Sequence, residues 1–172
     1  GQFTVTGDMT VKVNEVALAE IQIDKTPQTY VYDGEAKKFA IRSVPMGLTG
    51  FTVTYQDEST TYTEAPTNAG TYKVIINRAE DESFATFTKT IDAGLVIEQA
   101  ELKGINAPTW DATSSKWTGS SLGTWTGGSA ITEGKIYNVT FDPTDPNFKE
   151  IVFEGIKKNH RRVCGQESLH QL

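Results

Sequence analysis

The sequence has very little cysteine and histidine, which removes several kinds of site from consideration. Cys164 is the one cysteine, so a disulfide within the chain cannot form. The two histidines, His160 and His170, share a short C-terminal segment with Cys164, and this set cannot make a zinc site. Nucleophile elbows, phosphate-binding loops and metal-binding helix motifs are also missing. We therefore expect no enzymatic activity, no catalytic residues and no cofactor.

Long apolar runs and an excess of positive charge are missing as well. The sequence contains no stretch of about 18 apolar residues, the length that a membrane-spanning helix needs. The 172 residues carry a formal net charge of −6. A negative chain repels the phosphates of nucleic acids and anionic lipid surfaces. We therefore expect no nucleic-acid partner and no insertion into a membrane.

The sequence is rich instead in threonine, valine, isoleucine and aromatic residues that alternate with polar ones. The alternation is clearest at residues 51–55 and 72–76, and it is typical of half-exposed antiparallel strands. Turn formers such as Asp33-Gly34 and Asn68-Ala69-Gly70 separate the strands, and we expect their glycines to adopt positive φ. Short strands at intervals of about ten residues predict a sandwich or a small barrel.

Two parts of the sequence echo each other. In the first, Gly70 leads into a strand with Tyr72, and an acidic stretch then precedes Phe84. In the second, a glycine leads into a strand with Tyr137, and an acidic turn precedes Phe148. The two tyrosines lie 65 residues apart, which is a plausible repeat length for a small β module.

Residues 21–100 carry a series of short motifs in a specific order. The motifs are Ile23-Asp24-Lys25-Thr26-Pro27, residues 30–37, residues 51–55, residues 65–74 and the closing phrase Leu95-Val96-Ile97-Glu98-Gln99-Ala100. This series resembles the tandem repeats of bacterial surface proteins known as MBG or YDG-type domains. The resemblance implies a small non-catalytic β module whose closing phrase leads into a further repeat. Within it, we expect Tyr72 to bury its ring and to bond its hydroxyl to the backbone.

Residues 101–157 form a second segment with a different resemblance. Ala107-Pro108-Thr109-Trp110, Gly123-Thr124-Trp125 and Tyr137-Asn138-Val139 are similar to fibronectin type III or related Ig-like modules. A diverged second repeat of the MBG type fits the segment too. At about 57 residues, it is short for a complete sandwich, which usually has about 100 residues.

These patterns predict an all-β protein made of Ig-like antiparallel β-sandwich modules in tandem. A β-grasp fold is the alternative for the first module, since strand patterns do not fix topology. We expect residues 1–20 to be the end of a preceding module or edge strands. Residues 21–100 and 101–157 are the two β modules, and residues 158–172 are a flexible basic tail.

Three tryptophans, Trp110, Trp117 and Trp125, lie close together in the second segment. Exposed indoles stack on sugar rings, so these residues are the candidates for a ligand-binding site. Tryptophan is more often buried, however, and the same residues can simply form a core. We expect at least two of the three to be mostly buried.

Asp142, Asp145 and Asn147 are the candidate metal ligands, because calcium prefers such closely spaced oxygen atoms. The two prolines among them, Pro143 and Pro146, indicate a rigid turn instead, and turn chemistry already explains Asp, Asn and Pro here. The segment also lacks the glycine and the distal glutamate of an EF-hand loop. We therefore expect no metal site.

The function that we predict is that of a non-catalytic repeat region in a secreted or cell-surface bacterial protein. It would act as a spacer, a stalk or an adhesin scaffold, with neighbouring domains of the same chain as its partners. The alternative is a module that binds a glycan or a host protein through the aromatic residues of segment 110–125. Either function places the protein outside the cell or on its surface.

Overall fold

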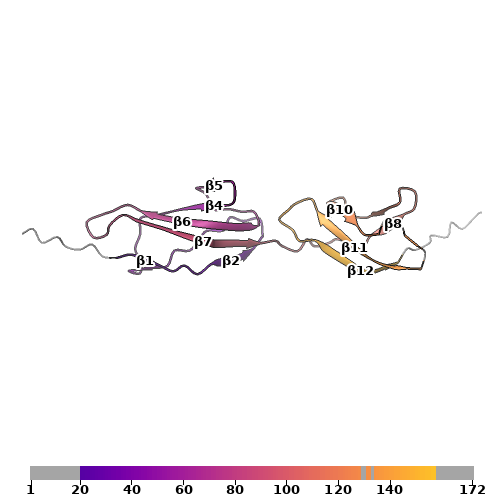
Figure 1. Cartoon of the computed structure of the whole chain (residues 1–172), viewed down its shortest axis with the longest axis horizontal. Coiled ribbons are helices and arrows are strands. Elements are labelled where there is room, and N and C mark those ends of the chain that lie inside the picture. The colour runs from indigo at the N-terminus through magenta and orange to yellow at the C-terminus, as the bar shows by residue number, and fades with distance from the viewer. Residues whose placement is uncertain (1–19, 129–130, 133, 158–172) are drawn as a thin grey trace, which may run out of the picture.

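The computed structural model describes residues 20–128, 131–132 and 134–157. All regular structure in these residues is β-strand, and no helix occurs among them, so the predicted all-β class is confirmed. Two β units lie end to end (Figure 1). We call residues 20–98 the first unit and residues 109–157 the second unit; residues 99–108 connect them.

The first unit is built on a five-stranded sheet with the strand order β2-β7-β6-β4-β5. The strands are β2 (Gln28–Val31), β4 (Phe51–Gln56), β5 (Thr61–Tyr62), β6 (Gly70–Arg78) and β7 (Phe87–Glu98). The short strands β1 (Gln22–Ile23) and β3 (Ser43–Val44) form a separate antiparallel pair. The longest strands, β6 and β7, make a central hairpin, and β2 runs parallel to β7 at one edge of the sheet.

The core of the first unit lies on one face of the central hairpin. On β6, Tyr72, Val74 and Ile76 are buried, whereas the alternate residues Thr71 and Lys73 are exposed. This is the period-2 pattern that the sequence predicts for a half-exposed strand. Burial of each such aliphatic side chain contributes about 1.5–3 kcal/mol to stability, so the hairpin is the main stabilising element of this unit.

The second unit has a three-stranded antiparallel sheet and a separate hairpin. The sheet has the order β10-β11-β12, with bounds Gly123–Thr126, Ile136–Pro143 and Ile151–Lys157. The hairpin pairs β8 (Thr109–Asp111) with β9 (Lys116–Thr118). Its core is small: Val139 and Phe141 of β11 are fully buried, and Trp117 of β9 is 6% exposed.

The echo in the sequence has a counterpart in the two hairpins β6–β7 and β11–β12. Pairing between β6 and β7 shifts register between Tyr72 and Val74, and pairing between β11 and β12 shifts between Tyr137 and Val139. The opposite strand carries a left-handed residue near each shift, Ala93 (φ 50°) in β7 and Gly155 (φ 72°) in β12. The shifts differ in size, because four positions of β7 (Leu95 to Ile91) face two of β6, whereas three positions of β12 (Ile156 to Phe153) face two of β11. The two hairpins therefore share an irregularity after the tyrosine and not an identical bulge.

Several local predictions can be compared with the structure. Gly34 has φ 84°, as predicted for the Asp33-Gly34 turn, but Gly70 has no positive φ. The prediction for Gly70 is wrong because this residue already belongs to β6, where the ring of Tyr72 packs over it. The ring of Tyr72 is 5% exposed and its hydroxyl donates a hydrogen bond to the carbonyl of Asn68 at 2.8 Å, which confirms the predicted role of this tyrosine.

Other expectations differ from the structure or concern residues that it does not describe. The pairing of β2 with β7 is parallel, so the first sheet is mixed rather than purely antiparallel. A β-grasp fold needs a helix packed on the sheet, and residues 20–98 contain none. The expected preceding module (residues 1–20, except Glu20) and the basic tail (residues 158–172) lie outside the described residues.

Candidate functional site

The loop between β11 and β12, residues 144–150, lies against the end of the first unit. The amide of Ala100 donates to the carbonyl of Asn147 at 3.0 Å, and the amide of Lys149 donates to the carbonyl of Ala100 at 2.9 Å. These two bonds form a parallel β-bridge between Ala100 and Phe148. The connecting segment is thereby fixed to the second unit by its main chain.

The side chain of Asn147 extends this contact into the body of the first unit. Asn147 is 8% exposed, which is unusual for a polar residue in a loop. Its Oδ1 accepts a hydrogen bond from the amide of Ala69 at 2.7 Å, and its Nδ2 donates to Oδ1 of Asn68 at 3.4 Å. Asn68 and Ala69 immediately precede β6, so the bond reaches the central hairpin of the first unit.

A third contact joins two aromatic rings. The rings of Tyr32 and Phe148 meet edge to face, with centroids 5.5 Å apart and an interplanar angle of 85°. Tyr32 is itself held to the end of β7, because its amide donates to the carbonyl of Glu98 at 2.8 Å. Aromatic pairs of this geometry contribute about 0.5–1.5 kcal/mol beyond the area that they bury.

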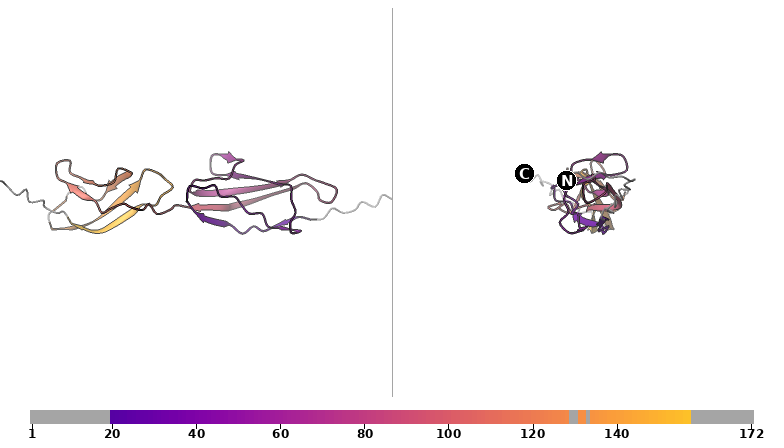
Figure 2. Two further views of the ribbon diagram at one scale, coloured as in Figure 1. Left: turned by 180° about the vertical axis from the view of Figure 1, so that it is seen from behind. Right: turned by 90° about the vertical axis from the view of Figure 1, so that its left-hand side faces the viewer.

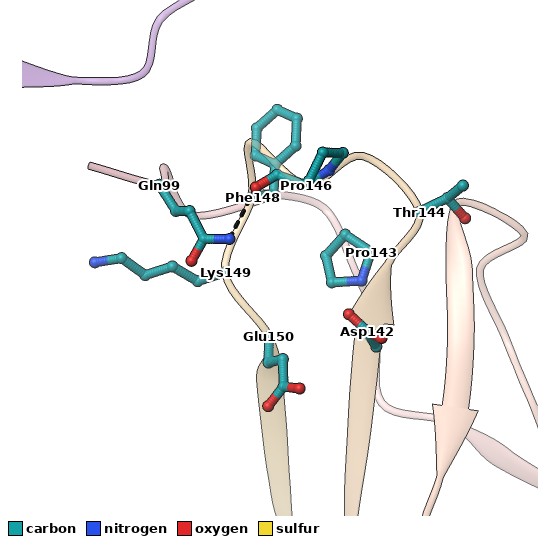
Figure 3. A pocket seen from close by; sticks show the side chains of 8 residues that line it. All are labelled: Gln99, Asp142, Pro143, Thr144, Pro146, Phe148, Lys149 and Glu150. Carbon is teal, nitrogen blue, oxygen red and sulfur yellow. Dashed lines mark hydrogen bonds between the residues drawn. The ribbon is translucent and has the colours of Figure 1, made fainter. Parts of the chain in front are cut away.

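Gln99 supplies the last polar contact of the junction. Its Nε2 donates to the carbonyl of Pro146 at 2.8 Å, as the dashed line in Figure 3 shows. Gln99, Pro146 and Phe148 line one side of an open cavity of about 580 Å³, and Asp142 and Glu150 lie on its opposite side, on β11 and beside the start of β12. The second unit thus touches two segments of the first unit, at Tyr32 and at residues 68–69, and it also touches residues 99–100 of the connecting segment. Contacts at three points fix an orientation, whereas a single tether does not.

The three predicted metal ligands are not brought together around a common point. Oδ1 of Asp145 accepts the amide of Asn147 at 2.9 Å, which shapes the loop, and Oδ1 of Asn147 is bonded to Ala69. Asp142 is exposed on β11. Among residues 20–128, 131–132 and 134–157, no group of three His, Cys, Asp or Glu side chains is placed to hold a metal ion. The same turn chemistry that suggested calcium serves the contact between the units.

The three predicted tryptophans do lie close together, around an open depression of about 480 Å³ that Lys116 and Thr124 also line. Trp110 and Trp117 pair across β8 and β9 with ring centroids 5.3 Å apart. The ring of Trp125 packs on Phe141 at 4.7 Å. Trp117 is buried, whereas Trp110 and Trp125 are half-buried.

Two of the indoles are also tied to the backbone. Nε1 of Trp117 donates to the carbonyl of Gly127 at 2.5 Å, and Nε1 of Trp125 donates to the carbonyl of Ser120 at 3.1 Å. These bonds are typical of core tryptophans. The depression therefore combines a structural role with two partly accessible rings.

The sequence predicted none of the junction contacts. Asn147 was considered only as a metal ligand, and Ala69 and Gln99 only as parts of a turn and of a closing phrase. The available signal was the echo that placed Phe84 and Phe148 at equivalent positions, because Phe148 is the residue of that echo whose ring meets the first unit.

Comparison with known proteins identifies the family of the first unit. Residues 19–101 match the family model described as MBG domain, which confirms the resemblance predicted for residues 21–100. MBG domains are non-catalytic repeat modules found in cell-surface proteins. No curated protein and no solved structure matches the chain significantly. Within the described ranges, the structure contains no helix long and apolar enough to cross a membrane.

Proposed function

We propose that this chain is a rigid spacer in a secreted or cell-surface bacterial protein, where it holds other domains away from the cell. The observation that carries the proposal is the junction at Ala100, Asn147 and Phe148, where main-chain bonds, a buried amide and a ring contact join the units. A stalk needs such a junction because a flexible linker between units shortens the mean distance that they span.

The path of the chain supports the same function. β6 begins beside Asn68 at the junction and runs away from it, so the β6–β7 loop lies at the outer end of the first unit. β12 begins after the junction loop and runs to the outer end of the second unit (Figure 2). Entry and exit at opposite ends allow units to be added in a line, as a spacer requires.

Residual dipolar couplings measured by NMR on the whole chain test the proposal. A rigid spacer aligns as one body, so the amides of β6–β7 and of β11–β12 should fit a single alignment tensor with the orientation seen here. Fits that need two different tensors would show units that move independently, and the spacer function would then be wrong.

A second candidate function is the binding of a glycan or a host protein at the aromatic depression. It is favoured by the half-buried rings of Trp110 and Trp125 beside Lys116, since flat apolar area next to a polar side chain is what sugar rings need. Titration of the chain with glycans, followed by tryptophan fluorescence, tests it. Emission that shifts for the parent chain but not for W110A would favour binding, and an unchanged spectrum with every glycan would favour the spacer alone.

A further inference from the structure

The outer end of the first unit carries a loop that is equivalent to the junction loop. The loop closes the β6–β7 hairpin at residues 79–86, as residues 144–150 close β11–β12. In both loops an aspartate precedes a phenylalanine by three residues, which places Asp81 with Asp145 and Phe84 with Phe148. The junction loop faces the unit that precedes it, and by this comparison the loop at residues 79–86 faces whatever precedes the first unit.

The two loops also share their internal hydrogen bonds. Oδ1 of Asp81 accepts the amide of Ser83 at 2.9 Å, and Oδ1 of Asp145 accepts the amide of Asn147 at the same distance. The amide of the aromatic residue is bonded back to the aspartate in both loops, to the side chain in one and to the carbonyl in the other. The aromatic residue is therefore presented in the same way.

Arg78 holds the outer loop in place. Its side chain is 9% exposed and makes an ion pair with Asp81, and its Nε donates to the carbonyl of Thr49 at 2.9 Å. Its guanidinium also lies 5.2 Å from the ring centroid of Phe84. A loop fixed by a buried arginine is preorganised, which lowers the entropic cost of docking onto it.

The chain enters both units through matching sequences. Ala19-Glu20-Ile21 leads into the first unit and Ala100-Glu101-Leu102 leads into the second, and in each case a proline follows the alanine after eight residues. Ile21 and Phe87 line one groove at the outer end of the first unit, so the entering chain lies beside the start of β7. Ala19 thus corresponds to Ala100, which forms the bridge at the junction.

We propose that the segment ending at Ala19 docks on this outer loop as Ala100 docks on the junction loop. In this docking, the carbonyl of Ser83 and the amide of Ala85 take the acceptor and donor roles that the carbonyl of Asn147 and the amide of Lys149 have at the junction. The outer loop is thereby the docking surface for the end of a preceding β unit of the same chain. This inference rests on the proposed spacer function, since it extends the same junction to a second place.

One difference between the two loops determines how strong the outer junction is expected to be. Asn147 reaches Ala69 with its side chain, whereas Ser83 is shorter and exposed. The outer junction is therefore expected to rely on its two main-chain bonds and on Phe84, and to be weaker than the junction seen between the two units.

Amide hydrogen exchange of the whole 172-residue chain, resolved by NMR, tests the proposal. The amides of Ala19 and Ala85 should exchange at least about tenfold more slowly than in an unstructured peptide, and a cross-strand NOE should join Ala19 to Phe84. In A85P, which removes the donor, the amide of Ala19 should lose its protection while that of Ala100 keeps it. K149P is the matched control, because it should release Ala100 alone.

The outcomes separate this inference from the function on which it rests. Ala19 and Ala85 exchanging at peptide rates without the NOE, while Ala100 and Lys149 stay protected, would overturn the outer junction and leave the spacer in place. If the amides of Ala100 and Lys149 exchange at peptide rates in the parent chain, the spacer function itself is overturned. The NOE is measured without any substitution, so the test does not depend on the folding of A85P.

Discussion

Replacement of Asn147 by alanine is the sharpest test of how the two units are held together. Its Oδ1 is 2.7 Å from the amide nitrogen of Ala69, in a side chain that is 8% exposed. The substitution removes this acceptor and leaves the amide of Ala69 without it. Loss of a partner for a buried donor costs about 1–3 kcal/mol. Ala69 is only half-buried, so water can replace part of the bond and the lower end of that range, about 1 kcal/mol, is expected.

This loss of free energy should weaken the docking of the two units. About 1 kcal/mol changes the ratio of docked to undocked molecules roughly fivefold. The amide of Lys149, which donates to the carbonyl of Ala100 at the junction, should therefore exchange with solvent about five times faster in N147A than in the parent chain. All three tryptophans belong to the second unit. Tryptophan fluorescence in urea therefore follows the unfolding of this unit, and its midpoint should fall when the docking is weaker.

N106A is the matched control for this experiment. Asn106 is exposed in the connecting segment, and exposed substitutions usually change stability by less than about 0.5 kcal/mol. If Lys149 exchange and the urea midpoint are the same in N147A and N106A, the reasoning is refuted, because the buried side-chain amide of Asn147 then contributes nothing to the junction.

Three further predictions concern the individual units. The hydroxyl of Tyr62 and the amides of Ser59 and Thr60 hold the pKa of Asp57 at about 2, below its ordinary value of 3.8. Y62F should therefore raise the pKa of Asp57 toward 3.8 in an NMR titration. Y30F is the control and should leave this pKa unchanged. A depressed pKa stabilises the fold above pH 3.8, and that contribution is lost as the pH falls from 3.8 toward 2, so the loss of stability over this range should be smaller in Y62F. Y72F removes the bond from the tyrosine hydroxyl to the carbonyl of Asn68 and should lower the free energy of unfolding by about 0.5–1.5 kcal/mol in urea denaturation; an unchanged midpoint would show that this bond is not stabilising. A Cβ at Gly123 would lie 2.2 Å from the carbonyl oxygen of Asp142, so G123A should lower the free energy of unfolding by at least about 1–3 kcal/mol, as followed by tryptophan fluorescence. At Gly104 a Cβ meets open space but φ is 79°, so G104A should lower it by about 1 kcal/mol.

The strands with one buried face were predictable from the sequence. Alternation at residues 51–55 and 72–76 corresponds to β4 (Phe51–Gln56) and β6 (Gly70–Arg78), because a half-buried strand must place apolar residues at every second position. The edge strand β2 was harder, since most of its residues are exposed and its parallel partner, β7, lies more than sixty residues away. The residues around β2 carry no sequence pattern that indicates so distant a partner.

The tryptophan cluster was predictable as a cluster but not as a site. Spacing brought Trp110 and Trp117 together because a tight hairpin pairs residues on β8 and β9. The degree to which each ring is covered depends on contacts made by the sheet β10-β11-β12. Tyr137 of β11 contacts Trp117, and Phe141 of β11 contacts Trp125, its cross-strand partner on β10. Burial of that kind is decided by tertiary packing and has no signature in the spacing of the residues.

The junction escaped prediction for a different reason, and that reason bears on how such units can be repeated. Four of its contacts involve a main-chain amide or carbonyl, at Ala69, Ala100, Pro146 and Lys149. Main-chain groups are present whatever the side chain is, so they leave no apolar pattern and impose few constraints on sequence. The two loops that we compare accordingly share little beyond an aspartate and an aromatic residue, Asp81 with Phe84 and Asp145 with Phe148. A junction of this kind constrains the side chains of the units that it joins very little, so the cores of such units can differ, as those of the two units here do.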